Sequence, residues 1–207
     1  METTTLMTRT QPEGRVQHRT RVEQSILAAT HGLLADRAAA DVTIADIMDA
    51  VGLSRTAFYR YFPDVNAVLV RLLREIRAQF VGAWLECPDD ADFVVLLRGD
   101  AHENVARFVA HGAIIAACLD SRTSAPELFV AWLEIVEEVV AEVAERIGDL
   151  NRRGVTNVGS AYETARALVT FTIYYVTEGL ARTEATGTEA LEETLAAVWY
   201  RTIFAAA

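Results

Sequence analysis

The stretch AVGLSRTAFYRYFP, Ala50 to Pro63, puts two arginines, two tyrosines and two phenylalanines into one short segment behind a glycine. A buried core helix would rarely carry Arg55 and Arg60, and a fully solvated helix would rarely carry so many aromatic rings. A helix that packs one face and lays the other against a polyanion would carry both kinds of residue. The stretch therefore predicts a helix that contacts an anionic surface.

Two short helices are expected, one on each side of the glycine. Thr43 and Asp46 form a capping-box pair that starts the first helix. Gly52 ends it, because glycine suits the left-handed residue that closes a helix. Ser54 caps the second helix, which is expected to run to about Tyr61. Together they predict a helix-turn-helix, whose second helix lies in the major groove of DNA.

The second helix divides into a packed face and an exposed face. Phe58 and Phe62, four residues apart, are expected to pack against the first helix. The residues nearer the exposed side have side chains suited to guanine edges, thymine methyls or phosphates; they are Arg55, Thr56, Tyr59 and Arg60. Ser54 and Thr43, at helix starts, are typical phosphate partners. The alternative is an ordinary helical hairpin whose aromatic rings fill a core.

The flanking segments complete a small N-terminal domain. Residues 1–17 are polar and are expected to form a flexible arm, whose Arg15, with Arg19 and Arg21 behind it, follows the DNA backbone or a minor groove. A helix is expected over 18–36, so that residues 18–63 form the DNA-binding domain. A proline, Pro63, opens a fourth helix, which links to the remainder of the chain over residues 64–86. The segment CPDDAD, residues 87–92, is expected to be a linker.

The stretch VTIADIMDAVGLSRTAFYRYFPDVNAVLVRLL, residues 42–73, resembles the signature of the TetR (tetracycline-repressor) family. That signature has a threonine opening the second helix, a vGxsrxtfYxyF recognition segment and a long fourth helix. The match runs from Arg19 to Arg74 with the family's spacing. SRTAFYRYFP looks most like the mycobacterial ethionamide-resistance-regulator branch. The resemblance implies an all-α fold, in which a three-helix helix-turn-helix domain is joined by the fourth helix to a larger ligand-binding and dimerisation domain.

The resemblance also implies which residues contact DNA, and these are Thr43, Ser54, Arg55, Thr56, Tyr59 and Tyr61. One departure concerns the start of the fourth helix. Many members of the family have a phosphate-contacting lysine there, where this chain reads Asp64-Val65-Asn66. That contact is either lost or replaced by the N-terminal arm.

Charge is distributed unevenly along the chain. Residues 1–80 hold 10 Arg and 9 acidic residues, a net charge of +1, whereas residues 81–207 hold 9 Arg and 20 acidic residues, a net charge of −11. An anionic partner must therefore meet the N-terminal part, and the C-terminal part would repel DNA. Helices are expected in that part over 92–110, 111–121, 125–151, 159–184 and 188–204. Gly112 is one of the expected breaks, and capping boxes are expected at Ser124 with Glu127 and at Ser160 with Glu163.

Aromatic side chains in the acidic half predict a pocket for a small apolar or aromatic molecule, because ligand pockets are mostly apolar with a few polar groups. The candidate ligand-binding residues are Phe108, Phe129, Trp132, Phe171, Thr172, Tyr174, Tyr175, Glu178 and Trp199. The alternative is that these rings only fill the core. The last two helices carry an apolar stripe that predicts a four-helix homodimer interface; its residues are Ala165, Val169, Ile173, Val176, Leu180, Leu191, Leu195, Val198 and Trp199. Such a dimer implies a near-palindromic operator.

Catalysis and metal binding find no support in the sequence. His102-Glu103 is followed by Ala106 four residues after the histidine, so no HExxH motif exists. No glycine-rich phosphate loop, cofactor motif or signal peptide is present, and we expect a cytoplasmic protein with Cys87 and Cys118 reduced. The sequence predicts a homodimeric repressor of the TetR type that a ligand releases from DNA. An activator of the same fold, or a small-molecule-binding protein with weakened or lost DNA binding, is the alternative.

Overall fold

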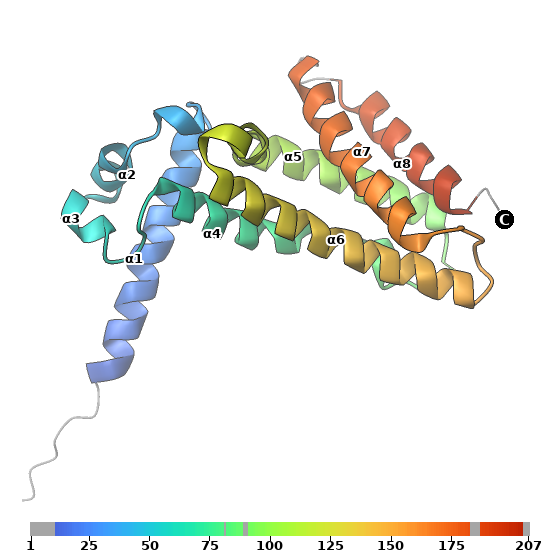
Figure 1. Ribbon diagram of the computed structural model, residues 1–207, viewed down its shortest axis with the longest axis horizontal. Helices are drawn as coiled ribbons and strands as arrows, with labels where there is room; N and C mark the ends of the chain where they lie inside the picture. Colours follow the sequence, from blue (N-terminus) through green and yellow to red (C-terminus); the bar gives the residue numbers. More distant parts are fainter. Residues whose placement is uncertain (1–10, 81, 89–90, 183–186, 205–207) are drawn as a thin grey trace, which may run out of the picture. The chain divides into compact units, whose positions relative to one another are not determined.

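The computed structural model describes residues 11–80, 82–88, 91–182 and 187–204, with side chains from Gln17 onward. Within these ranges every regular element is a helix (Figure 1). The chain forms two compact units, Met1–Leu72 and Leu73–Ala207, which divide inside the fourth α-helix. The sequence placed this division earlier, between residues 63 and 64.

The first unit is built on the elements α1 (Gln11–Leu34), η1 (Ala39–Asp41), α2 (Ile44–Val51), α3 (Arg55–Phe58) and the first part of α4 (Val65–Arg77). Its core holds fully buried side chains from each of the four α-helices, including Ile26, Ile47, Phe58 and Val68. Residues 11–17 belong to α1, so the expected arm is helical over that stretch. Residues 1–10 lie outside the described part of the chain.

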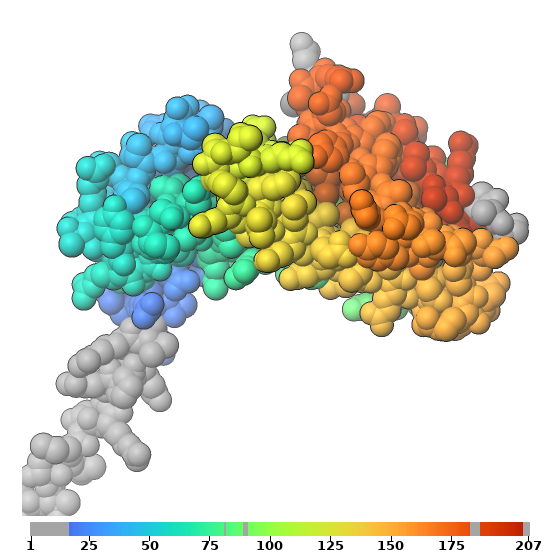
Figure 2. All heavy atoms as spheres, viewed as in Figure 1, coloured from blue at the N-terminus to red at the C-terminus, as the bar shows by residue number. Residues whose placement is uncertain are grey.

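The second unit contains the short helices η2 (Ala78–Phe80) and η3 (Ala83–Leu85) and four long helices. These are α5 (Phe93–Ser124), α6 (Pro126–Arg152), α7 (Ala161–Arg182) and α8 (Glu189–Phe204). Helix α6 packs against α5 and α7, and α8 packs against α5 and α7; α6, α7 and α8 are seen along one face in Figure 2. Apolar side chains between these helices form its core, among them Trp84, Leu97, Ile147 and Ile203.

Three expected helix boundaries in the second unit were wrong. The linking helix expected over residues 64–86 ends at Arg77, and the short helices η2 and η3 follow it. Helix α5 continues through Gly112 to Ser124, because Ile114, Ile115 and Cys118 beyond the glycine are buried in the core. Packing of these residues outweighs the cost of one helical glycine, about 1 kcal/mol. Ser124 therefore ends α5 and does not cap α6, whose start has no side-chain cap.

The apolar stripe of the last two helices is largely used inside the chain, contrary to the reasoning from sequence. Ala165, Val169, Val176, Leu191 and Leu195 are all buried in the single subunit. The exposed face of α7 carries polar residues and two tyrosines instead. Across the described ranges, none of the helices combines the length and the apolar character needed to cross a membrane.

Candidate nucleic-acid interface and ligand cavity

The turn between α2 and α3 depends on a glycine. Gly52 has φ +75° and ψ +30°, the left-handed conformation that side chains with a Cβ rarely adopt. Its N–H donates to the carbonyl of Asp49, and the N–H of Leu53 donates to the carbonyl of Met48 at 2.9 Å. These bonds close α2 and turn the chain sharply into α3. The expected helix-turn-helix is present, although α3 is only four residues long and continues as a turn through Tyr61.

The start of α2 is fixed by the expected capping box. The backbone N–H of Asp46 donates to the hydroxyl of Thr43 at 3.2 Å, and the N–H of Thr43 donates to the Asp46 carboxylate at 2.9 Å. The hydrogen bonds from Thr43, and next the charge of Arg37, hold the pKa of Asp46 below its usual value of 3.8. The Thr43 hydroxyl also donates to this carboxylate. A hydroxyl has a single proton to donate, so a phosphate contact from Thr43 would require that bond to open.

The predicted division of the α3 segment into two faces is present in the structure. Phe58 and Phe62 are buried, and their ring centroids lie 6.0 Å apart. The exposed residues are Ser54, Arg55, Thr56, Tyr59 and Arg60, whereas Tyr61 is half-buried. Tyr59 is 63% exposed and meets the Phe58 ring edge-on. The expected cap by the Ser54 side chain was wrong, because its hydroxyl makes no capping bond. The hydroxyl is therefore able to donate to a phosphate.

The position where the sequence departs from the family pattern has a structural role. The Asp64 carboxylate accepts a hydrogen bond from the N–H of Ala67 at 2.8 Å, so it caps the first turn of α4. On α1, Arg19 and Arg21 are exposed, while the side chain of Arg15 lies outside the described residues.

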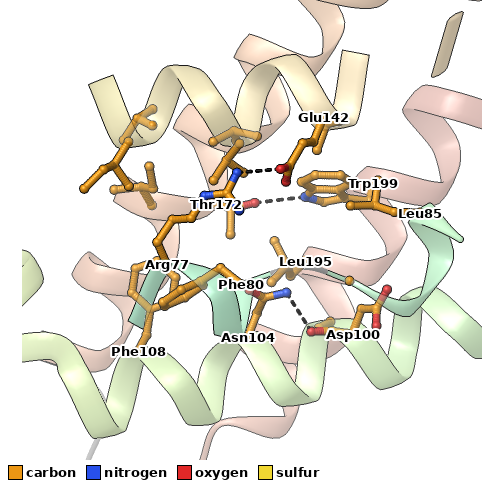
Figure 3. A pocket seen from close by; sticks show the side chains of 18 of the residues that line it. Arg77, Phe80, Leu85, Asp100, Asn104, Phe108, Glu142, Thr172, Leu195 and Trp199 are labelled. Atoms are coloured by element: carbon orange, nitrogen blue, oxygen red, sulfur yellow. Dashed lines mark hydrogen bonds and ion pairs between the residues drawn. The ribbon is translucent and has the colours of Figure 1, made fainter. Parts of the chain in front are cut away.

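The second unit contains an apolar cavity that is partly open to solvent (Figure 3). Its volume is about 110 Å³. Because a cavity needs about 10–15 Å³ to hold one water molecule, it has room for several non-hydrogen atoms. Its wall comes from α4, η2, η3 and all four long helices.

Five aromatic residues line the cavity, and these are Phe80, Trp84, Phe108, Trp132 and Trp199. Four of them form edge-to-face pairs. The ring centroids of Phe80 and Phe108 lie 5.4 Å apart, and those of Trp84 and Trp199 lie 5.9 Å apart. These rings make much of the wall aromatic.

Few polar groups interrupt this apolar wall. The Trp199 indole N–H donates to the Thr172 hydroxyl at 2.9 Å, and that hydroxyl donates to the Leu168 carbonyl. On another side Arg77 donates to Glu142 (Figure 3). The buried Asp100 carboxylate accepts hydrogen bonds from two backbone N–H groups of η3.

The cavity brings together four of the nine residues expected from sequence, and these are Phe108, Trp132, Thr172 and Trp199. The other five, Phe129, Phe171, Tyr174, Tyr175 and Glu178, are not among its lining residues. The Phe171 and Tyr175 rings stack on one another with centroids 4.8 Å apart, and Tyr174 points outward at 56% exposure. Glu178 pairs with Arg182 on the surface, and the guanidinium of Arg122 lies over the ring of Phe129.

Sequence reasoning missed the polar residues of the cavity. Asp100 and Asn104 occupy the same helical stripe as Leu97, Ala101 and Phe108 of α5. A carboxylate within an otherwise apolar stripe was the signal that could have identified this site. Arg77 and Glu142 gave no such signal, because each lies in a helix with many other charged residues.

A helix-turn-helix with an exposed basic face, joined to a larger helical unit around a cavity, defines a DNA-binding transcriptional regulator. The model of the family described as bacterial regulatory proteins, tetR family, matches residues 26–72. The transcriptional regulator EthR of Mycobacterium tuberculosis strain H37Rv is 31% identical over 150 residues, 70% of this chain and 69% of that protein. The chain therefore belongs to the tetR family of bacterial regulatory proteins.

Solved structures show the same fold at lower sequence identity. Salmonella enterica GusR is 16% identical with a TM-score of 0.72, and the match covers 94% of this chain and 98% of that one. A protein from Saccharomonospora viridis, solved in complex with choline, is 18% identical with a TM-score of 0.70. That match covers 88% of this chain and 96% of the other.

Proposed function

We propose that the protein is a cytoplasmic, homodimeric repressor that binds a near-palindromic operator and leaves it when a small apolar or aromatic molecule occupies the cavity. The observation that carries the DNA-binding part is the exposed face of the α3 segment. Arg55, Thr56, Tyr59 and Arg60 project to solvent while Phe58 anchors the helix. Among the described residues neither arginine has an acidic partner, so both are available to guanine edges or phosphates.

The cavity supports the ligand-binding part of the proposal. Helix α4 is continuous from Val65 to Arg77, and Leu73, Ile76 and Arg77 at its end line the cavity. A guest molecule therefore contacts the same helix that begins in the DNA-binding unit. To release DNA, the ligand must bind the DNA-incompetent state more tightly than the DNA-competent state. The choline complex of the Saccharomonospora viridis protein is a small-molecule complex of the same fold.

The exposed sides of α7 and α8 are the proposed dimer interface. Tyr162 and Tyr174 are exposed on α7, and Phe171 and Tyr175 beside them are half-buried in the single chain. Aromatic residues are enriched at protein interfaces. A two-fold dimer through this surface would pair two recognition segments, as a palindromic site requires.

The test of DNA binding is fluorescence anisotropy with labelled fragments of the protein's own promoter region, against a scrambled fragment, at two salt concentrations. We expect tight binding to one fragment that weakens as salt rises, since phosphate contacts release counterions. Arg55→Ala and Tyr59→Ala should each weaken binding with an unchanged melting transition and dimer mass. Loss of a base contact costs roughly 1–3 kcal/mol, and a phosphate contact costs less.

The matched control is Arg98→Ala, which removes an exposed arginine from α5 in the second unit. It should leave operator affinity unchanged. If Arg55→Ala binds the operator as tightly as this control, Arg55 has no part in recognition. A reporter gene behind the bound promoter, with and without the protein, distinguishes a repressor from an activator.

A small-molecule-binding protein with weakened DNA binding is the second candidate. It is favoured by the start of α4, where Asp64 caps the helix and the segment Asp64-Val65-Asn66 lacks the phosphate-contacting lysine that the family resemblance leads us to expect. Selection from a pool of random DNA decides between the two. Failure to enrich any sequence, with the protein folded and dimeric, would favour the ligand-binding protein.

A further inference from the structure

We propose that the cavity takes an organic cation, an ammonium group carried on an aromatic or alkyl body, with its charge beside Asp100 and its body among the aromatic rings. This inference names the chemical class of the ligand that the cavity binds. Its regulatory consequence, release of the operator, rests on the proposed function. Three features of the cavity support it. They are a buried carboxylate that has no positively charged partner among the described residues, an arginine that is already paired with glutamates, and an aromatic wall.

The first feature is the Asp100 carboxylate, whose residue is only 7% exposed. Oδ1 accepts from the N–H of Ala83 at 2.9 Å, and Oδ2 accepts from the N–H of Trp84 at 3.2 Å. Among the described residues no arginine or histidine pairs with it. A buried charge without a counter-charge is costly, and buried charges in proteins are normally paired. Asp100 is one of the residues that line the cavity, so a cationic guest can provide the missing partner.

The second feature is that the cavity's own cation is already engaged. The Arg77 guanidinium donates to Glu142 and lies 3.3 Å from the carboxylate of Glu138. The charged residues that line the cavity are Arg77, Glu142 and Asp100. Since the first two neutralise one another, the lining carries a net negative charge that belongs to Asp100. An anionic guest would meet this carboxylate as a like charge.

The third feature is the aromatic wall beside the carboxylate. The N–H of Trp84 that binds Asp100 belongs to a residue whose ring is also packed against Trp199 in the wall. Cations within about 6 Å of a ring centroid are attracted to its face, most strongly for tryptophan and in desolvated sites. Three of the five rings around this cavity are tryptophans. Aromatic faces also stabilise a quaternary ammonium, which has no proton to donate to Asp100.

Space and long-range charge agree with the same guest. A Cβ at Gly82 would lie 2.7 Å from the Asp100 carboxylate and 2.9 Å from the Trp84 ring. Any larger residue would therefore displace the Asp100 carboxylate or the Trp84 ring. The net charge of −11 on residues 81–207 attracts cations toward the second unit.

Asp100 has a structural role as well, because its two hydrogen bonds hold the start of η3. A neutral amide of the same shape separates the two roles. Asp100→Asn keeps one carbonyl oxygen as an acceptor and removes the charge. If Asp100 were only structural, this substitution would lower stability without changing which guest the cavity prefers.

The test uses two probes of nearly identical shape, benzyltrimethylammonium and neopentylbenzene, in which a neutral carbon replaces the charged nitrogen. All three tryptophans of the chain line the cavity, so intrinsic fluorescence reports its occupancy without DNA. We expect the wild-type protein to bind the cation roughly tenfold more tightly than the neutral probe, as cation–π attraction and a nearby carboxylate predict. Asp100→Asn should reduce this preference to about twofold or less.

Glu103→Gln is the matched control, because it removes one negative charge from an exposed position of the same helix. It should keep the full preference for the cation. Equal binding of the two probes to the wild-type protein would overturn the proposal, and this comparison depends on no variant. A folded Asp100→Asn protein that keeps the preference would overturn it also. A cation that binds the cavity and does not release operator would instead contradict the proposed regulation.

Discussion

Arg146 on α6 holds one wall of the cavity, and its removal provides the sharpest test of how that wall is built. The residue is 8% exposed. Its Nε donates to the carbonyl of Trp84 at 3.3 Å, and Nη2 donates to the carbonyl of Cys87 at 2.7 Å. Both carbonyls belong to the segment between α4 and α5 that contributes Trp84 and Leu85 to the lining.

Arg146→Met keeps the apolar stem of the side chain, to about the position of Nε, and removes all of its donors. Each buried carbonyl left without a donor costs about 1–3 kcal/mol. The desolvation of the guanidinium, which the variant no longer requires, offsets part of that loss. We expect a net loss near 3 kcal/mol for two carbonyls, with the midpoint of thermal unfolding lowered by roughly 6–12 °C.

The assay is urea unfolding followed by tryptophan fluorescence at fixed protein concentration. It reports on the second unit, because all three tryptophans lie there. The control is Arg152→Met, which removes an arginine of the same helix that is 70% exposed and pairs with Asp149. Such a surface pair contributes about 0–1 kcal/mol. If the two variants unfold at the same urea concentration, the bonds from Arg146 do not hold the wall.

Three further predictions concern local features. Gly52→Ala should destabilise the first unit by about 1–2 kcal/mol through backbone strain alone, since a Cβ there meets no atom within 4 Å. Gly52→Asn should destabilise it less, and thermal melting followed by circular dichroism measures both losses. The pKa of Asp46 is lowered, first by the hydrogen bonds from Thr43, so its ionised carboxylate adds stability that is fully present above pH 3.8 and is lost as the pH falls through the folded-state pKa. The wild-type protein should therefore be more stable than Asp46→Asn above pH 3.8, and acid unfolding curves should show this difference shrinking at lower pH. Burial raises the pKa of the Cys118 thiol to about 12, so a thiol reagent at pH 8 should modify half-buried Cys87 first and Cys118 only after unfolding.

The helix-turn-helix could be predicted because its signals are local in sequence. The capping box of Thr43 with Asp46 spans three residues, and the left-handed Gly52 ends a helix by its own conformational freedom. The spacing of Phe58 and Phe62 is likewise enough to assign the packed face. Each of these features is fixed by neighbours within one helical turn, and all of them are confirmed by the structure.

Signals of the same kind failed where distant packing competed with them. Ser124 followed by Glu127 has the pattern of a capping box, yet α5 extends to Ser124 and Pro126 opens α6. The Ser160 hydroxyl does accept a hydrogen bond from the N–H of Glu163, at 3.3 Å. The residues just before Ser160 are not helical, so no earlier helix extends to it. A capping pattern therefore predicts a helix start only when the preceding residues have no reason to remain helical.

The ligand cavity was predictable only in part, because aromatic residues have the same pattern in a core and around a cavity. Trp132 and Trp199 line the cavity, whereas Phe171 and Tyr175 use their faces to stack on one another. Which partner an aromatic ring meets depends on contacts between helices far apart in the chain. Periodicity along a single helix contains no information on that choice.

Polar residues on an apolar stripe are the better guide to a site of this kind, and Asp100 illustrates the reason. An apolar side chain at its position would be compatible with the stripe formed by Leu97, Ala101 and Phe108, without the desolvation of a charge. Its hydrogen bonds to η3 repay part of that cost, but an asparagine oxygen would accept the same kind of bond without a charge. Retaining the full charge is favourable where a cation binds beside it. The two probes of matched shape and different charge, together with Asp100→Asn, therefore address the function of the cavity more directly than its stability.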